Sequence, residues 1–149
     1  MRYFEAVAAA YRHHPGTPQL PVRATATAAA YDFFSSVNAL IKPGSYKTIW
    51  TDVRARFPDN EVLILNVRSS MGEHPVMLAN TQGWIDSDYY NNISTGGNIG
   101  IMLYNLGTRP YIINVGDRIA QGMFVQYQVA DNGNTDNIRS GGFGSTNQE

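Results

Sequence analysis

The chain has 149 residues with 11 basic and 12 acidic side chains, a formal net charge of −1 and no cysteine. This length favours one domain with a substantial core, and the balanced charge offers no bulk attraction to nucleic acid or to an anionic membrane. The lack of cysteine excludes disulfides, thiolate metal sites and a cysteine nucleophile, and the absence of a signal-peptide pattern or an apolar run of ~18 residues predicts a cytoplasmic protein.

The N-terminal part opens with ambiguous patterns. Residues 2–11 combine alanines, which favour helix, with Tyr, Phe and Val, which suit a strand equally well; propensity alone predicts a helix. Three prolines and a glycine in residues 15–21 predict a loop. Small side chains in residues 23–30 would let another backbone or a bulky group approach closely, and Asp32 stands at the end of this run.

A series of short strands separated by Pro, Gly, Asn and Asp turns follows. Residues 61–67 form a continuous apolar run of strand length, which predicts a strand buried on both faces. Nine Tyr and six Phe also favour sheet over helix. The pattern predicts an all-β sandwich or barrel. The other expected strands are residues 46–50, 53–57, 76–79, 99–106, 111–113 and 118–127.

Two polar stretches adjoin these strands. Arg68, Ser69 and Ser70 follow the buried strand and could gather several donors for a phosphate, although a helix cap with a surface Arg is an equal alternative. In residues 83–90 (GWIDSDYY), Asp86 and Asp88 would share one face of an extended backbone. A turn between the two carboxylates, or a solvated loop that carries two acids, is the alternative for this stretch.

The last residues lose the apolar pattern, so we expect a domain of residues 1–130 and a mobile C-terminal tail of residues 131–149. Phe143 lies among glycines in a segment too polar to form its own core. Glycine lets the backbone wrap tightly, Phe offers a stacking face, and Arg, Ser and Thr offer anion donors. The tail therefore resembles a lid over something flat and negatively charged, such as a nucleotide; an unattached surface tail is the alternative.

Five blocks of this sequence, in this order, resemble the five motifs of the trimeric deoxyuridine triphosphate nucleotidohydrolase (dUTPase) family. The resemblance extends from Arg23 to Thr146, and the linking sequence looks most like dUTPases of low-GC Gram-positive bacteria and their phages. The blocks are Ala-Tyr-Asp ending at Asp32, Arg68-Ser69-Ser70, Gly83-Trp84-Ile85-Asp86-Ser87-Asp88-Tyr89, Gly116-Asp117-Arg118-Ile119-Ala120-Gln121 and Gly141-Gly142-Phe143-Gly144-Ser145-Thr146.

The resemblance implies an all-β, jelly-roll-like β-barrel that assembles as a homotrimer with shared active sites and a tail that reaches across subunits. It implies Mg2+-dependent hydrolysis of dUTP to dUMP and pyrophosphate, which limits uracil in DNA and supplies dUMP for dTMP synthesis. It also implies that residues 2–11 form a strand, and this expectation replaces the helix that propensity favours.

Carried over by position, the resemblance makes Asp86 the base that activates water for attack on the α-phosphorus. Asp32 would hold Mg2+ through coordinated water. Asn80 and backbone groups near Gly83 and Ile85 would read the uracil edge. The remaining expected contacts are Tyr89 with the deoxyribose, Phe143 with the uracil, Ser69, the Ser70 amide and Gln121 with phosphate oxygens, Arg68 as a brace, and Arg139, Ser145 and Thr146 with the γ-phosphate.

Some positions depart from the family pattern. Trp84 is bulkier than the usual Val or Leu, and Arg139 lies one residue closer to Phe143 than in the commonest spacing. Asp88 and Arg118 are expected to form a structural ion pair. Two other functions stay open: dCTP deaminase, which shares the fold but typically has Asp-Pro-Gly at the Asp86 block, and a nucleotide-sensing regulatory protein whose partner would meet the long loop of residues 91–98.

Overall fold

The computed structural model describes residues 1–133 and 135–144, which form strands and short 3-10 helices. The strands are β1 (Tyr3–Ala6), β2 (Tyr31–Phe34), β3 (Ala39–Ile41), β4 (Tyr46–Trp50), β5 (Val53–Arg56), β6 (Glu61–Asn66), β7 (Val76–Leu78), β8 (Gly83–Asp86), β9 (Gly100–Asn105), β10 (Tyr111–Ile113) and β11 (Arg118–Gln126). The 3-10 helices are η1 (Ala9–Tyr11), η2 (Ser69–Glu73) and η3 (Ser87–Tyr89). No helix in these two ranges is long and apolar enough to cross a membrane.

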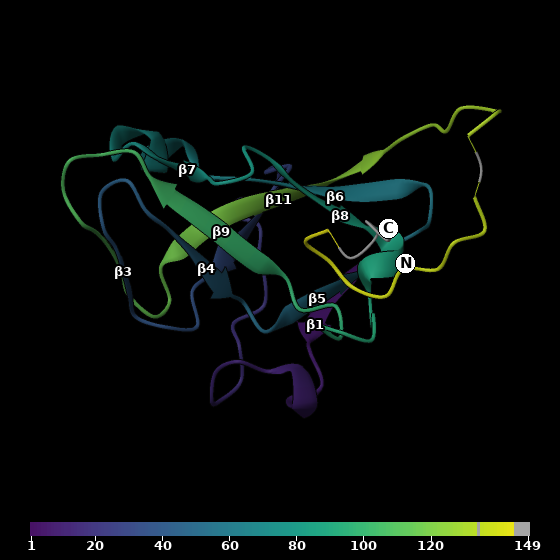
Figure 1. Cartoon of the computed structure of the whole chain (residues 1–149), viewed down its shortest axis with the longest axis horizontal. Coiled ribbons are helices and arrows are strands. Elements are labelled where there is room, and N and C mark those ends of the chain that lie inside the picture. The colour runs from purple at the N-terminus through teal and green to yellow at the C-terminus, as the bar shows by residue number, and fades with distance from the viewer. Residues whose placement is uncertain (134, 145–149) are drawn as a thin grey trace.

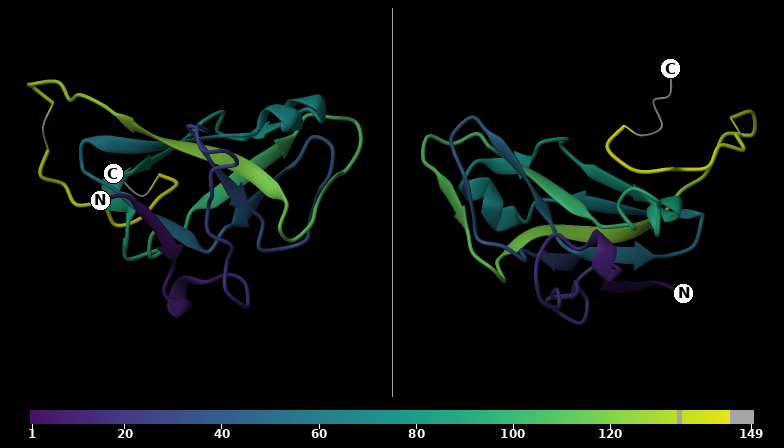
Figure 2. Two further views of the ribbon diagram at one scale, coloured as in Figure 1. Left: turned by 180° about the vertical axis from the view of Figure 1, so that it is seen from behind. Right: turned by 60° about the horizontal axis from the view of Figure 1, so that its bottom comes forward.

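The strands pair antiparallel in four sheets (Figures 1 and 2). The largest sheet has the order β2-β11-β6-β8, and a second sheet has the order β4-β9-β7. Two pairs, β1 with β5 and β10 with β3, complete the described sheet structure. Because most neighbours in a sheet are distant in sequence, residues of the site come from several parts of the chain.

The core is one continuous cluster of buried side chains from both larger sheets. Phe33, Leu63 and Leu65 come from the β2-β11-β6-β8 sheet, and Ile101 and Leu103 come from β9. All five side chains are almost inaccessible to solvent. This arrangement is that of two sheets packed face to face, each with one apolar face turned inward.

The all-β prediction is confirmed, whereas the strands of the described residues form separate sheets and not one closed barrel. Residues 2–11 hold the short strand β1, as the resemblance implied, but the chain continues into η1 and not further along the strand. Three alanines and a tyrosine follow Val7, and this stretch closes a single 3-10 turn, in which Tyr11 N donates to Ala8 O at 2.9 Å.

A bulge in β11 controls which side chains face outward beside β2. Arg118 lies opposite Phe34 and Ala120 opposite Phe33, so Ile119 is an extra residue in the pairing. Ile119 and Ala120 are consequently both buried, although they are consecutive. An extra residue reverses the alternation of side chains beyond it, and Gln121 therefore points to the same face as Arg118.

The segment after β11 leaves the sheet and folds back toward β8 and η3, as the yellow trace in Figure 1 shows. Ser94 N donates to Ser140 O at 3.3 Å, which attaches this segment to the loop that follows η3. Residues 139–144 thereby lie beside the strand that carries Asp86.

Candidate active site

A cavity of about 170 Å3 lies between β8, β9 and the C-terminal segment. Its volume is close to that of engineered cavities, on the order of 150 Å3, that accept a six-membered ring. Gly100 and Met102 of β9 form part of its wall. The expected site residues that line it are Asn80, Gly83, Ile85, Asp86, Tyr89, Arg139 and Phe143.

A tight turn before β8 brings Asn80 to this cavity. Thr81 has a left-handed backbone (φ 64°), and its N–H donates to Leu78 O at 2.9 Å. At the start of β8, Gly83 packs so closely on β6 that a Cβ atom there would lie 3.1 Å from Leu65 Cβ. A larger residue would push the hairpin away from β6, so Gly83 places its backbone groups at the cavity wall.

Tyr89 forms a fixed wall of the cavity. Its side chain is buried, and its hydroxyl donates to the Asn98 carbonyl at 2.7 Å and accepts from Thr95 Oγ1 at 3.1 Å. Burial raises the pKa of Tyr89 above its ordinary value, so the phenol stays neutral. Both contacts are made by the hydroxyl, which leaves the ring to face the cavity and the tail.

Asp86 lies at the cavity with about half of its side chain exposed. Arg139 of the tail forms a fork between two carboxylates: its Nη2 donates to Asp86 Oδ2 at 2.5 Å and its Nε donates to Asp88 Oδ1 at 2.6 Å. Asp88 is therefore paired with Arg139. The expected pair of Asp88 with Arg118 is not formed within the described part of one chain, where Arg118 approaches Asp32.

Within this single chain, the C-terminal segment covers the cavity beside β8. Gly142 lies against the ring of Tyr89, where an added Cβ would be 2.7 Å from Cε2. Phe143 follows it on the cavity wall with its ring largely exposed. Two other expected tail contacts, Ser145 and Thr146, lie outside the described residues.

A second polar group gathers on β2, β6 and β11. The buried carboxylate of Asp32 accepts from Arg68 Nε at 2.8 Å, and Arg118 Nε lies 3.5 Å from its other oxygen. Gln121 is directly opposite Asp32 in the β2–β11 pairing. Two guanidinium groups on one carboxylate leave a net positive group, which suits a phosphate.

Ser69 and Ser70 adjoin this group at the start of η2 and are exposed. Gln121 Nε2 donates to the Val67 carbonyl at 3.4 Å, which ties β11 to the end of β6. The sequence left a choice between a phosphate site and a helix cap with a surface Arg. The structure contains the short helix, but Arg68 pairs with Asp32 and is not a free surface residue.

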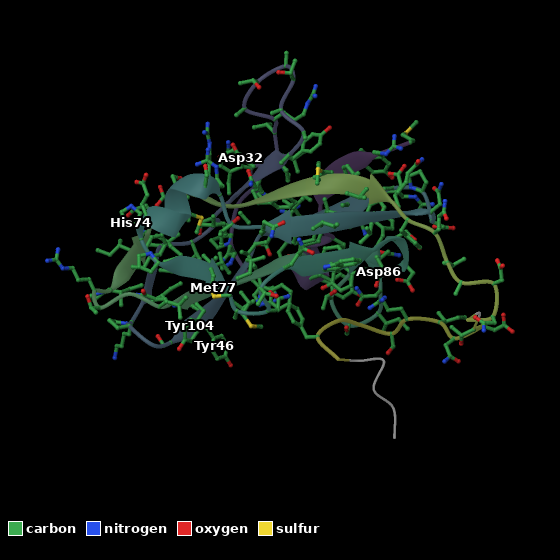
Figure 3. The ribbon with its side chains drawn as sticks, turned by 90° about the horizontal axis from the view of Figure 1, so that it is seen from above. Asp32, Tyr46, His74, Met77, Asp86 and Tyr104 are labelled. Atoms are coloured by element: carbon green, nitrogen blue, oxygen red, sulfur yellow. The ribbon has the colours of Figure 1, made fainter. Side chains whose placement is uncertain are left out.

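The two groups do not meet within one chain. Asp86 lies opposite Val62 on β6, whereas Gln121 lies opposite Asn66, which is four residues further along the same strand. That offset corresponds to roughly 13 Å along β6. Figure 3 labels Asp32 and Asp86, and they lie in different parts of the molecule.

The carboxylates of the site fit a Mg2+ ion whose other ligands are water and substrate phosphate oxygens. Within residues 1–133 and 135–144, no cluster of three or more His, Cys, Asp or Glu side chains could cage a metal. Asp32 Oδ2 is buried and accepts no hydrogen bond in the described part of the chain. This oxygen has the ion-pair contact with Arg118 Nε at 3.5 Å but no hydrogen bond within those residues, so it retains lone pairs for a water ligand of a phosphate-bound ion.

Sequence reasoning did not identify two aromatic features beside the cavity. Trp50, at the end of β4, stacks on His13 and contacts Phe143. Trp84 donates its indole N–H to Gln82 Oε1 at 2.8 Å, and Gln82 Nε2 donates to Asn66 Oδ1 at 3.3 Å. The sequence gives no signal for either feature, because each depends on which strands and loops become neighbours.

Comparison with known proteins places these observations in one family. The dUTPase family model matches residues 17–147. The deoxyuridine 5'-triphosphate nucleotidohydrolase of Lactococcus lactis is 35% identical over 130 residues, covering 85% of this chain and 87% of the relative. The crystal structure of a dUTPase from Streptococcus mutans gives a TM-score of 0.77 at 32% identity and covers 86% of this chain and 98% of that one.

A more distant similarity concerns a mutant dUTPase from phage phi11 of S. aureus, whose structure reveals the coordination of a structural Mg(II) ion. Its TM-score is 0.69 at 21% identity, over 92% of this chain and 97% of that one. At this identity the similarity supports the fold alone.

Proposed function

The chain belongs to the dUTPase family, and on this basis we propose that it hydrolyses dUTP to dUMP and pyrophosphate. This activity would limit uracil in DNA and supply dUMP for dTMP synthesis. The observation that carries the proposal is the cavity at β8, where a hairpin backbone, the carboxylate of Asp86 and the ring of Phe143 meet. In the proposed reaction, the hairpin binds the base, Asp86 serves the reacting phosphate, and Phe143 belongs to the lid.

Asp86 is the general base of the proposed reaction. Its carboxylate takes a proton from a water whose oxygen forms a bond to the α-phosphorus, while the bond to the bridging oxygen breaks and pyrophosphate leaves. Asp86 must be free to accept that proton, and in this structure it accepts from Arg139. Arg139 therefore moves from Asp86 to the γ-phosphate when the substrate binds. Ser145 and Thr146 would contact the same phosphate.

Uracil and deoxyribose selectivity come from the hairpin. Asn80, Gly83 and Ile85 line the cavity, and we propose that the Asn80 side chain and the two backbones pair with the uracil edge, so that a cytosine edge would leave them unpaired. The ring of Tyr89 lies under the deoxyribose and leaves no space for a 2′-hydroxyl. Phe143 stacks on the uracil from the tail side, since it lines the same cavity.

The second polar group binds the triphosphate. Ser69, the Ser70 amide and Gln121 donate to phosphate oxygens, and Arg68 braces Asp32. Asp32 would hold Mg2+ through coordinated water, as a carboxylate can for an ion that keeps several of its own waters. Bound Mg2+ would neutralise negative charge that develops on the phosphates in the transition state.

The distance between the two groups supports a homotrimer with shared sites. Within one chain Asp86 and Gln121 are offset by four residues along β6, about 13 Å, which is too far for one α-phosphate to touch both. In the homotrimer, the β8 hairpin of one subunit meets the Asp32 group of its neighbour. Residues 131–149 form the tail that closes this site.

A regulatory role is a second candidate, and the loop of residues 91–98 is the place for it. Ile93 is 81% exposed, and the adjacent Ser94 is hydrogen bonded to Ser140 of the tail. A protein partner that binds Ile93 would therefore act on the segment that covers the cavity. dCTP deamination has less support, because Ser87 and Asp88 follow Asp86 where that family typically has Pro-Gly.

The test is pyrophosphate release from dUTP, dCTP, dTTP and UTP with Mg2+, for the wild-type protein and for Asp86→Asn. We expect turnover of dUTP alone, and a loss of about 100-fold or more in kcat for Asp86→Asn, as for removal of a general base. Binding of dUTP without pyrophosphate release would contradict the enzymatic proposal and favour the regulatory one. Ammonia release from dCTP would identify a deaminase.

A further inference from the structure

Trp50 forms the centre of an aromatic group beside the cavity. Its indole stacks on the imidazole of His13 with ring centroids 4.7 Å apart and an interplanar angle of 13°. Phe143 also contacts Trp50, with centroids 5.8 Å apart and an interplanar angle of 81°, an edge-to-face contact. The N-terminal segment, β4 and the C-terminal tail therefore meet at one tryptophan.

The neighbouring strand holds Trp50 at this place. Trp50 lies opposite Gly100 in the β4–β9 pairing, and a Cβ atom on Gly100 would be 3.1 Å from the indole carbons. The absence of a side chain at Gly100 lets the indole lie close to β9. Gly100 also lines the cavity together with Phe143, so the indole lies immediately beside the cavity wall.

We propose that Trp50, braced by His13, is a positioning residue that seats Phe143 over the nucleotide cavity. This inference rests on the proposed function, because the cavity is taken to be the nucleotide site. Phe143 contacts the ring of Trp50 and also lines the cavity. Trp50 thereby selects, among the many conformations of a glycine-rich tail, those in which Phe143 is ready to stack on the base.

The physical effect is a smaller ordering cost when the substrate binds. Fixing each tail residue costs conformational entropy, and three glycines, the residues that lose the most freedom, lie next to Phe143 in the tail. A T-shaped aromatic pair offsets part of that cost. Loss of the pair should therefore reduce kcat/KM for dUTP by about two- to tenfold, and should leave the chemistry at Asp86 unchanged once the tail has closed.

The test compares Trp50→Leu, which keeps apolar bulk but removes the ring, with the conservative Trp50→Phe. Tyr46→Leu is the matched control, because Tyr46 lies on the same strand and the same outward face four residues away. Tyr46 is also 63% exposed and far from Asp86 in Figure 3. Each variant is made in the wild-type chain and in the Phe143→Ala chain, so that a double-mutant cycle isolates the contact.

We expect Trp50→Leu to lower kcat/KM for dUTP mainly through KM, Trp50→Phe to restore most of the loss, and Tyr46→Leu to match the wild type. In the Phe143→Ala chain, Trp50→Leu should have no further effect. Equal losses in both chains would overturn the proposal, because Trp50 would then act without Phe143. An increase in kcat/KM would also overturn it, since Trp50 would then hold Phe143 away from the base.

A second measurement is independent of turnover. Trypsin cleavage after Arg139, followed by mass spectrometry of the fragment of residues 140–149, reports how often the nucleotide-free tail leaves its seat. We expect Trp50→Leu to release this fragment a few-fold faster than Tyr46→Leu does. Equal cleavage rates in Trp50→Leu and Tyr46→Leu would show that Trp50 does not hold the tail. Wild-type protein without dUTP turnover would contradict the proposed function, while the cleavage comparison would still decide whether Trp50 holds the tail.

Discussion

Tyr89→Phe should destabilise the protein by about 2 kcal/mol while it preserves turnover of dUTP. The hydroxyl of Tyr89 makes two hydrogen bonds, to the Asn98 carbonyl at 2.7 Å and from Thr95 Oγ1 at 3.1 Å, and the tyrosine is buried. One neutral hydrogen bond contributes about 1 kcal/mol, and a buried carbonyl left without its donor costs roughly 1 to 3 kcal/mol. The ring, which faces the cavity, is unchanged in phenylalanine.

The assay pairs thermal unfolding with steady-state kinetics at one fixed protein concentration, because the stability of an oligomer depends on concentration. A loss of about 2 kcal/mol corresponds to a decrease in Tm of about 4 to 8 °C for a chain of this size. Tyr46→Phe makes the same chemical change at an exposed position and should leave Tm unchanged. Unchanged stability with a tenfold loss of kcat/KM would refute this assignment, because the hydroxyl would then contact the substrate.

Two further predictions concern ion pairs. Asp88→Asn removes one of the two carboxylates that pair with Arg139. Tryptic cleavage after Arg139 should therefore become about two- to fivefold faster, in keeping with the loss of one exposed ion pair. An unchanged rate would show that Asp88 does not hold the tail, and a weakened trimer would instead support the expected pair of Asp88 with Arg118. The hydrogen bond from Arg2 lowers the pKa of Glu61, so this pair contributes stability above pH ~4.3, which is lost as the pH falls through the lowered folded-state pKa. Denaturation from pH 7 to pH 3 should therefore show Glu61→Gln less stable than wild type at pH 7 and closer to it at pH 3; a constant difference would contradict the linkage.

Strand positions followed from the sequence where apolar alternation was bounded by turn residues. Residues 46–50 and 111–113 have the predicted bounds in β4 and β10. β3 was not predicted, because only three residues form it and the central one, Leu40, points outward. Of the 3-10 helices, only η2 was anticipated, as the helix-cap alternative for residues 68–70; η1 and η3 were not, since a single turn leaves no periodic pattern.

The site could be predicted as a set of residues but not as an arrangement. The bulge in β11 sets the register that places Gln121 opposite Asp32. The register between β6 and β8 places Asp86 opposite Val62, which is four residues along β6 from Asn66, the partner of Gln121. The hydrophobic pattern of a strand indicates which of its faces is buried, but it does not identify which residues of a distant strand lie opposite. The pairing of Arg139 with Asp86 was unforeseen for the same reason, because it depends on where the tail folds back.

The central claim is that a complete site needs the β8 hairpin of one chain and the Asp32 group of another. Two variants, Asp86→Asn and Asp32→Asn, should each be inactive when prepared alone. Mixing them by co-refolding at equal amounts and measuring pyrophosphate release from dUTP tests the claim directly. Random assembly of shared sites should recover about one quarter of the wild-type activity per site, because one site in four then combines an intact Asp86 with an intact Asp32. No recovery in mixed oligomers, confirmed by mass spectrometry to contain both chains, would show that each chain builds its own site.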